Sequence, residues 1–290
     1  MSFPQEFPVR PITQAVIPAA GFGTRLRPLT YAYPKELLPI GRKPVLAHVV
    51  EELLGAGIVR ALFIVSERKP EIRAFLGDKY QAEITGTAHT LECEYTFQNE
   101  MRGSGDAVLK AEAWANSAPF VVAFGDCLID APDPSEPLRR TLATHQKQNA
   151  GITILVEQVP RENVSRYGVL TPETELPPQP TEPFAASGIV EKPNIEDAPS
   201  NLVVAARFVC EPILFEYLRK ALPDSRGEIN LPDSFQAMRR DGFGLWAVPL
   251  RDKEVRRDIG NFGSFFTTFV RYALDDPDYG AEVRKVLSAE

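Results

Sequence analysis

A glycine-rich turn directly after an apolar run most constrains what this chain can fold into. The run Ala15-Val-Ile-Pro-Ala-Ala20 is followed by Gly21-Phe-Gly-Thr-Arg-Leu-Arg-Pro28. Two glycines let backbone N–H groups approach an anion without a Cβ in the way, and Arg25 adds a planar fork of donors that matches phosphate oxygens. The Lys-Ser or Lys-Thr of a Walker A loop and the third glycine of a dinucleotide loop are both missing. The pattern therefore predicts a phosphate-binding turn of another kind, although Gly-x-Gly alone is also typical of any tight turn.

Charge supports a small anionic ligand. The formal net charge of −7 argues against nucleic acid as a partner, because phosphate backbones bind to basic surfaces. Around the glycine turn the sign reverses, and we expect an anion pocket there; a solvated basic face is the alternative. Five of the six charged residues between positions 25 and 43 are cationic, the exception being Glu36: Arg25, Arg27, Lys35, Arg42 and Lys43.

Apolar runs and cysteines bear on where the protein works. The longest apolar runs, such as 61–65 and 119–124, are far shorter than the ~20 residues that span a bilayer, so we expect no membrane segment. Cys93, Cys127 and Cys210 are odd in number and lack paired spacing. This pattern predicts reduced thiols in a cytoplasmic protein. A catalytic role for Cys127 is an alternative that we do not favour.

The first half of the chain alternates strand and helix patterns. Apolar residues spaced by about 3.6 predict a helix that begins at Pro44 and ends near Gly55 and Gly57. The other expected elements are strands at 61–65, 93–97 and 119–124 and helices at 71–76 and 104–115. Such alternation is typical of a doubly wound α/β sheet, in which ligands lie beyond the carboxyl ends of the strands. The glycine turn and Gly125-Asp126 would both lie there.

The second half is mixed. A proline-rich surface loop is expected at 172–183, and helices from about residue 260 close the fold. Four phenylalanines of this last segment are expected in the core: Phe262, Phe265, Phe266 and Phe269. The other expected elements are strands at 152–156, 188–190, 202–209 and 244–248 and helices at 212–222 and 230–240.

An extended pattern carries a resemblance to a known family. Gly-x-Gly-Thr-Arg-Leu-x-Pro-x-Thr from Gly21, then Pro34-Lys-Glu-Leu-Leu-Pro39 and Lys43-Pro44, resembles the opening signature of the sugar-1-phosphate nucleotidyltransferases. The Pro-Lys-Glu-x-Leu-Pro form is most similar to the bacterial UTP:glucose-1-phosphate uridylyltransferases. The resemblance implies a Rossmann-like mixed sheet flanked by helices, of the glycosyltransferase-A-like type, with C-terminal helices. It also implies one domain over 1–290. In that domain, about 12–130 would bind nucleotide, about 150–260 would bind sugar phosphate, and about 260–290 would form the C-terminal helices.

The resemblance assigns two metal ligands. In the family, a Gly-Asp after a buried strand and an Asp-x-Gly-Asn near the C-terminus hold the metal, and both motifs match here, at Asp126 and Asp258. Carboxylate oxygens suit Mg²⁺ shared with substrate phosphates. Alone, each aspartate would more often be a helix cap or a turn residue.

The resemblance also assigns the substrate contacts. Gln98-Asn-Glu-Met-Arg-Gly-Ser-Gly-Asp106 is similar to the family's base-recognition loop, although it has Gly-Ser-Gly-Asp where the uridylyltransferases usually have Gly-Leu-Gly-His. Tyr167-Gly168-Val169 and Glu191-Lys192-Pro193 resemble the sugar-phosphate half. The implied sugar-phosphate contacts are Gly168, Glu191 and Lys192. The implied nucleotide contacts are Ala20, Gly21, Gly23, Thr24, Arg25, Gln98 and Gly103.

The implied reaction is Mg²⁺-assisted, in-line transfer of a uridylyl group from UTP to glucose 1-phosphate, which gives UDP-glucose and pyrophosphate. The catalytic residues are expected to be Arg25, Lys35 and Lys192. Base and sugar remain open, so thymidylyl or another nucleotidyl transfer to a different sugar 1-phosphate is an alternative. A regulatory protein that binds nucleotide sugars without catalysis is another. Relatives generally assemble through C-terminal helices, which implies a homo-oligomer, dimer or tetramer.

Overall fold

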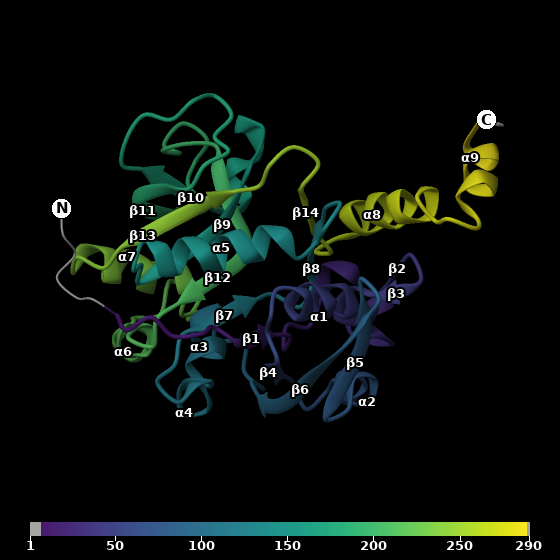
Figure 1. The fold of residues 1–290 in the computed structure, drawn as a ribbon, viewed down its shortest axis with the longest axis horizontal. Helices are drawn as coiled ribbons and strands as arrows, with labels where there is room; N and C mark the ends of the chain where they lie inside the picture. Colours follow the sequence, from purple (N-terminus) through teal and green to yellow (C-terminus); the bar gives the residue numbers. More distant parts are fainter. Residues whose placement is uncertain (1–6, 289–290) are drawn as a thin grey trace.

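A ten-stranded mixed sheet runs through the computed structural model, which describes residues 7–288 (Figure 1). Its strand order is β10-β11-β13-β9-β12-β7-β1-β4-β6-β5. Neighbouring strands in the order β7-β1-β4-β6 run parallel, with Val16 opposite both Leu62 and Val122. These four strands are β1 (Gln14–Pro18), β4 (Arg60–Val65), β6 (Thr87–Phe97) and β7 (Phe120–Ala123). The predicted doubly wound pattern is thus present in the first half.

Antiparallel strands extend this parallel core on both sides. At one edge, β5 (Lys79–Ile84) forms a hairpin with β6. On the other side β12 runs antiparallel to β7 and continues the sheet into the second half of the chain. The strands of that half are β9 (Ile152–Gln158), β10 (Gly168–Pro172), β11 (Phe184–Glu191), β12 (Leu202–Cys210) and β13 (Leu245–Pro249). One continuous sheet therefore joins the two halves of the sequence.

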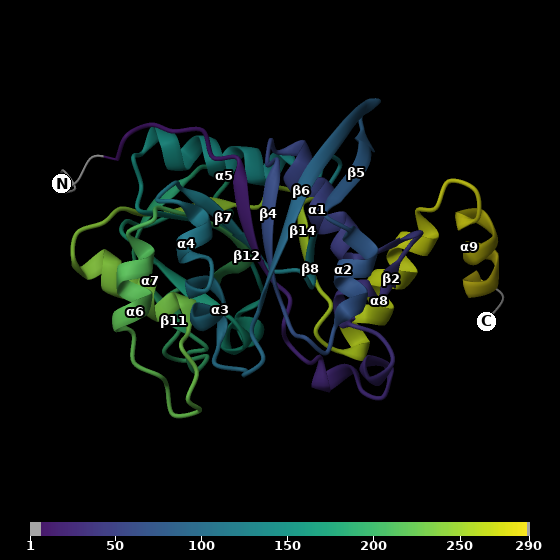
Figure 2. The same ribbon diagram turned by 90° about the horizontal axis from the view of Figure 1, so that it is seen from below.

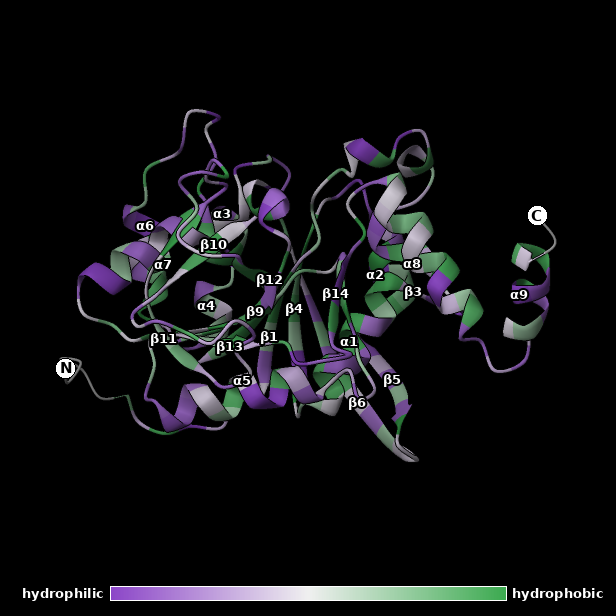
Figure 3. Ribbon diagram, turned by 90° about the horizontal axis from the view of Figure 1, so that it is seen from above, coloured by the Kyte–Doolittle hydropathy of each residue, from purple (hydrophilic) through white to green (hydrophobic). Residues whose placement is uncertain are grey.

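Helices cover both faces of the sheet (Figure 2). Because successive side chains of a strand point to opposite faces, Val16 packs with one helix layer, whereas Ala15 and Ile17 pack with the other. The first layer comprises α3 (Ser104–Leu109), α4 (Glu112–Ala115), α6 (Leu214–Lys220) and α7 (Leu231–Arg240). The second comprises α1 (Val45–Gly55), α2 (Pro70–Leu76) and α5 (Glu136–Lys147). Hydrophobic residues accordingly concentrate on the central strands (Figure 3).

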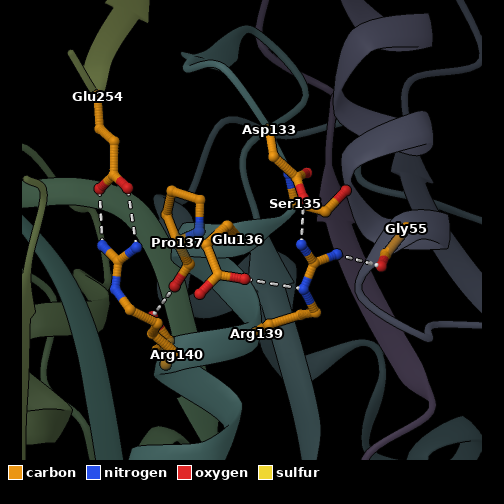
Figure 4. A network of polar contacts seen from close by, with 9 residues as sticks. Gly55, Asp133, Ser135, Glu136, Pro137, Arg139, Arg140 and Glu254 are labelled. Carbon is orange, nitrogen blue, oxygen red and sulfur yellow. Dashed lines mark hydrogen bonds and ion pairs between the residues drawn. The ribbon is translucent and has the colours of Figure 1, made fainter. Parts of the chain in front are cut away.

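A small ladder outside the main sheet brings distant segments together. Strand β8 (Cys127–Asp130) pairs antiparallel with β14 (Val255–Asp258), so that Cys127 lies opposite Asp258. The segment before β14 is tied to α5, because Arg140 donates to both carboxylate oxygens of Glu254 at 2.8 and 2.6 Å (Figure 4). This ion pair therefore anchors the β8–β14 ladder to α5, which packs on the main sheet.

The C-terminal helices α8 (Phe262–Leu274) and α9 (Gly280–Ser288) lie at one end of the molecule (Figure 1). Phe265 of α8 packs with the buried residues around the short strands β2 (Pro39–Ile40) and β3 (Lys43–Pro44). The expectation that all four phenylalanines are core residues is wrong for Phe266 and Phe269, which are 56% and 39% exposed.

Several elements differ from the sequence expectation. The helix predicted at 104–115 is broken into α3 and α4. The sequence does not predict the helix α5 or the strands β2, β3, β5, β8, β10 and β14. The proline-rich segment after β10 is an irregular loop, as expected. Within residues 7–288, no helix combines the length and apolar character needed to cross a bilayer.

Candidate active site

The parallel strands all end at one edge of the sheet, and most of the sequence motifs follow them there. The glycine turn follows β1, and Gly125-Asp126 follows β7. Gln98 comes directly after β6, and its N–H donates to Val65 O, the last residue of β4, at 2.8 Å. The chain passes from β1 to β4 and β6 on one side and returns to β7 on the other. The β1/β7 boundary is therefore the switch point where open α/β sheets bind ligands.

The glycine turn is shaped by its own residues. Gly23 has φ +61°, a left-handed conformation that disfavours side chains. A Cβ on Gly23 would lie 2.9 Å from the methyl group of Thr30, whose hydroxyl donates to Gly23 O at 2.9 Å. Thr24 and Arg25 form a 3₁₀ turn, η1 (Thr24–Leu26), directly after it, and both are exposed. The turn therefore presents Arg25 at the end of a rigid backbone.

Lys69, at the start of α2, fixes the turn from behind. Its ammonium donates to Ala19 O and Gly21 O and to the carboxylate of Glu36. Lys69 and Glu36 are 7% and 1% exposed, so the pair is sealed inside the protein. In a trans peptide the N–H points away from the preceding C=O. The N–H of Ala20 is therefore directed away from Lys69.

Asp126, Asp258 and Lys35 meet beside this turn. The β8–β14 ladder places the two aspartates at the same end, and the N–H of Ile259 donates to Asp126 O at 2.9 Å. Lys35, in the turn η3 (Lys35–Leu37), forms an ion pair with Asp126. A Cβ on Gly260 would approach both Asp258 Oδ2, at 2.8 Å, and Arg25 Nη2, at 3.2 Å. The three charged groups and Arg25 thus form one cluster.

The pKa values of this cluster follow its charges. Burial opposes the charge on Lys35, but Asp126 and then Glu36 outweigh it and raise the pKa of Lys35. Burial likewise opposes ionisation of Asp126, but Lys35 prevails and lowers the pKa of Asp126. Burial, followed by the charge of Asp126, raises the pKa of Asp258. The two carboxylates lie close enough for their charges to interact, and Lys35 lies near both, an arrangement that a further cation would stabilise.

The donor set fits a magnesium ion shared with substrate. Mg²⁺ is usually held by one or two carboxylates together with water and substrate phosphates. Asp126 and Asp258 supply two carboxylates, and no group of three or more His, Cys, Asp or Glu side chains suited to a metal occurs in the part of the chain that the structure describes. The chemistry of the pair therefore matches a metal that needs phosphate oxygens to complete its shell.

The sugar-phosphate motifs lie across a cleft from this cluster. Gly168 pairs with Glu191 between β10 and β11, and a Cβ on Gly168 would be 3.2 Å from Glu191 Oε2. Lys192 Nζ forms an ion pair with Glu191 at 2.9 Å, and the N–H of Lys192 donates to Tyr167 O. The absence of a side chain at Gly168 therefore leaves room for the Glu191 carboxylate.

A cleft of 620 Å³ connects the two sides. Cationic side chains outnumber carboxylates on its wall. Six of the residues singled out from the sequence line it: Arg25, Asp126, Gly168, Glu191, Lys192 and Asp258. The remaining ones, Ala20, Gly21, Gly23, Thr24, Lys35, Gln98 and Gly103, do not line it. Lys35 reaches Asp126 at its edge, and the amide nitrogen of Gln98 donates to Gly103 O.

One expectation about charge does not hold. Arg42 and Lys43 do not contribute to the anion pocket, because Arg42 pairs with Asp276 and Lys43 pairs with Glu51. The β2–β3 turn carries Arg42 to the segment between α8 and α9, whereas Lys43 contacts α1. Burial raises the pKa of the Cys127 thiol to about 12, so this cysteine, though close to the cleft, is not activated as a nucleophile.

Comparison with known proteins decides the family. A sequence model described as nucleotidyl transferase matches residues 14–274. The chain belongs to this family. The nucleotidyl transferase is 34% identical to the UTP–glucose-1-phosphate uridylyltransferase of Streptococcus pneumoniae serotype 4 (strain ATCC BAA-334 / TIGR4), with 95% of each chain covered. The match spans both halves of the sheet.

Solved structures agree with this assignment. The nucleotidyl transferase superposes on a UTP-bound UGPase from Acinetobacter baumannii with a TM-score of 0.82 at 25% identity, covering 95% of this chain and 98% of that one. It superposes on a UDP-glucose pyrophosphorylase complexed with UDP-glucose with a TM-score of 0.80 at 28% identity, covering 91% and 100%. The predicted mixed α/β fold is thereby confirmed.

Among the residues that sequence reasoning missed at the candidate site are Arg256 and Lys69. Arg256 lines the cleft, stacks on the Tyr167 ring at 4.2 Å and pairs with Glu157. Its place two residues before Asp258, in a strand with alternating faces, was a usable signal. Lys69 had no such signal, because nothing in its sequence neighbourhood marks a contact with the glycine turn.

Proposed function

We propose that this nucleotidyl transferase is a UTP:glucose-1-phosphate uridylyltransferase, which makes UDP-glucose and pyrophosphate. The observation that carries the proposal is the cluster of Asp126, Asp258, Lys35 and Arg25 beside the glycine turn, on a chain similar over 95% of its length to such enzymes. A protein that only binds nucleotide sugars would not need two facing carboxylates. In the proposed arrangement, residues of about 12–130 bind the nucleotide and residues of about 150–260 bind the sugar phosphate.

On the nucleotide side, the glycine turn and Arg25 hold the triphosphate. The turn contributes backbone donors from Ala20, Gly21, Gly23 and Thr24. Its rigidity comes from Lys69, which holds the carbonyls of Ala19 and Gly21 on the opposite side. Gln98 and Gly103 bind the base. Lys35 remains positively charged because Asp126 and Glu36 raise its pKa, and it stabilises the charge on the pentavalent phosphorus and on the departing pyrophosphate.

Asp126 and Asp258 would hold Mg²⁺, and the metal would supply positive charge that neutralises the substrate phosphates. On the other wall, Gly168 and Glu191 bind sugar hydroxyls and Lys192 binds the phosphate of the second substrate. Lys192 orients the attacking oxygen, and its charge offsets the repulsion between the two phosphate groups. A sugar 1-phosphate is already an anionic nucleophile at neutral pH because its second pKa is near ~6. The protein therefore needs no nucleophile or general base, and positioning accounts for catalysis.

The test is pyrophosphate release by the purified protein with Mg²⁺. UTP, dTTP, CTP, GTP and ATP are each paired with glucose 1-phosphate and with several other sugar 1-phosphates. We expect the combination of UTP and glucose 1-phosphate to be fastest. If the enzyme turned over dTTP faster than UTP, or another sugar 1-phosphate faster than glucose 1-phosphate, that substrate would replace the one proposed. Nucleotide binding without release from any pair would favour the regulatory alternative.

Exposed apolar residues support a homo-oligomer formed through the C-terminal helices. Phe266, Phe269 and Val270 of α8 are 56%, 39% and 39% exposed, and Val286 and Leu287 of α9 are 69% and 53% exposed. Apolar side chains gathered on two adjacent helices are typical of a protein–protein contact. The three cysteines are buried and unpaired, which supports a cytoplasmic protein.

A further inference from the structure

Gln98, the proposed base-binding residue, is held by two acceptors. Its side-chain nitrogen Nε2 donates to Gly103 O at 3.1 Å and to Asp106 Oδ2 at 2.7 Å. Gln98 is 5% exposed, and the Asp106 side chain is 16% exposed. Lys110, directly after the last residue of α3, lies 3.9 Å from the same Asp106 oxygen. The amide group of Gln98 is therefore enclosed between two fixed oxygens.

These contacts determine which way the amide faces. An amide side chain carries one end that only donates and one that only accepts, whereas a carbonyl and an ionised carboxylate only accept. If the Gln98 amide were flipped, its oxygen would face both Gly103 O and Asp106, and two hydrogen bonds would become repulsive contacts. The orientation with Nε2 toward Asp106 is thus required by chemistry and does not depend on how the nitrogen and oxygen atoms are assigned.

The other end of the amide is left for a ligand. Within residues 7–288, no group donates a hydrogen bond to Gln98 Oε1. The side-chain polar atoms sealed from solvent without a partner in this range are Arg140 Nε, Ser234 Oγ and Trp246 Nε1, so Oε1 keeps access to solvent. Gln98 therefore offers a fixed acceptor at the carboxyl edge of the sheet.

A fixed acceptor distinguishes the pyrimidines. Uracil and thymine carry an N3–H donor, whereas the N3 atom of cytosine is an acceptor. An acceptor facing N3 gains a hydrogen bond with the first two bases and a repulsive contact with the third. We propose that Asp106 is a positioning residue for base selection: it locks Gln98 with Oε1 toward the base, so that the site accepts uracil or thymine and rejects cytosine. This inference rests on the proposed nucleotide site.

Asp106 stands where the uridylyltransferases that this chain resembles usually have histidine. A neutral histidine can donate or accept according to its tautomer, whereas an ionised carboxylate can only accept. An aspartate at position 106 therefore excludes the flipped orientation of the Gln98 amide more strictly than a histidine would. Since thymine shares the N3–H edge with uracil, Asp106 does not separate UTP from dTTP, and that choice depends on other contacts.

The experiment measures binding of UTP and of CTP by calorimetry, with Mg²⁺ and without sugar phosphate, so that it does not depend on turnover. The wild type should bind UTP at least about tenfold more tightly than CTP, because a mispaired, desolvated polar group costs roughly that factor. In D106A only the longer contact with Gly103 O, at 3.1 Å, still orients the Gln98 amide, so the flipped orientation becomes accessible. UTP binding should then weaken by about tenfold, while CTP binding stays equal or improves. The ratio of the CTP and UTP dissociation constants should therefore approach one. D106N keeps an oxygen acceptor and should retain most of the preference.

Controls separate this role from a structural one. Q98L removes Oε1 and should abolish the preference, and Q98L/D106A should show the same ratio as Q98L. If D106A fails to fold, D106L fills the position with an apolar side chain and is expected to lose the preference in the same way. Equal losses for UTP and CTP, an unchanged ratio in the variants, or a wild type without preference would overturn the inference. A wild type that selects UTP in binding but releases no pyrophosphate would instead contradict the proposed reaction alone.

Discussion

Asp126 and Asp258 lie side by side because β8 and β14, far apart in the sequence, form one antiparallel ladder. Cys127 pairs with Asp258 in that ladder, and the Ile259 N–H binds the carbonyl oxygen of Asp126 at 2.9 Å. Neither aspartate could form a two-carboxylate site alone. The ladder therefore converts two ordinary strand-end residues into one site that faces the glycine turn.

The Lys69–Glu36 pair should determine both stability and nucleotide affinity. K69M leaves the Glu36 carboxylate buried without a partner and frees the carbonyls of Ala19 and Gly21, so we expect a loss of about 3–5 kcal/mol in the free energy of unfolding. The KM for UTP should rise because the turn loosens. Urea denaturation and steady-state kinetics measure the two effects. The double variant E36L/K69M should recover part of the stability but not the affinity. Wild-type values for K69M would contradict this role.

Gly23→Ala tests the shape of the turn. Its left-handed conformation costs about 1–2 kcal/mol for a residue with a Cβ, and the added methyl group would meet Thr30 at 2.9 Å. We expect kcat/KM for UTP to fall by about tenfold or more. Gly86→Ala is the matched control, because Gly86 has φ +78° at the tip of the β5–β6 hairpin with nothing near its Cβ position. G86A should lose stability but keep kcat/KM. Equal kinetics in both variants would rule out a special role for Gly23.

The sequence predicts most of the parallel half of the sheet, because β1, β4 and β7 are apolar and the connecting helix α1 has a clear 3.6-residue period. Of the longer and more polar β6, it predicts only the end. It does not predict β8 and β14, since segments of four residues, one of them Val-Arg-Arg-Asp, carry no strand signal of their own. The helix α5 was missed for a related reason: its buried face includes Thr141, Thr144 and His145, which an apolar pattern does not register.

In the candidate site too, some features could be predicted from the sequence and others could not. Motifs locate Asp126 and Asp258, but only the fold reveals that Arg42 and Lys43 leave the anion pocket, because a count of charges along the chain ignores where a turn carries them. The exposure of Phe266 and Phe269 likewise could not be predicted from the sequence. Their apolar character indicates burial, yet nothing in one chain's sequence says whether a helix is covered by its own core or by a second copy.

The ion pair between Arg140 and Glu254 should give a pH-dependent contribution to stability. Burial opposes ionisation of Glu254, but the hydrogen bonds and charge of Arg140 outweigh it and lower the pKa of Glu254. A carboxyl whose pKa is lowered by folding stabilises the protein above its unfolded pKa and loses that contribution as the pH falls through the folded value. R140M should therefore cost about 2 kcal/mol at pH 7, and its difference from the wild type should narrow as the pH falls toward 4.

Urea denaturation at several pH values measures this difference. Arg139 provides a neighbouring control, since it contacts Asp133, Glu136 and Gly55 O but not Glu254 (Figure 4). R139M should leave the segment before β14 in place and should not change the Mg²⁺ concentration needed for activity. R140M should raise that concentration. A difference between wild type and R140M that widens at low pH would contradict the assignment.

The exposed face of α8 should control assembly. Replacing two of its phenylalanines, in F266S/F269S, removes apolar surface that is already exposed in the single chain, so the fold should persist while the oligomer dissociates. Light scattering after size-exclusion chromatography measures the mass. F75S is a suitable comparison, because Phe75 of α2 is 38% exposed but lies outside the C-terminal helices. A monomeric wild type would disprove the proposed assembly.

The most direct test of the central claim is pyrophosphate release from UTP and glucose 1-phosphate, measured over a range of Mg²⁺ concentrations for D126N, D258N and D130N. Asp130 ends β8 opposite the site and pairs with Arg257, so it controls for the loss of a carboxylate in the same ladder. We expect D126N and D258N each to lose Mg²⁺-dependent turnover by a hundredfold or more, about 3 kcal/mol in transition-state stabilisation, with the fold intact. D130N should remain active. Full activity in D126N or D258N would show that the paired aspartates are not the metal site.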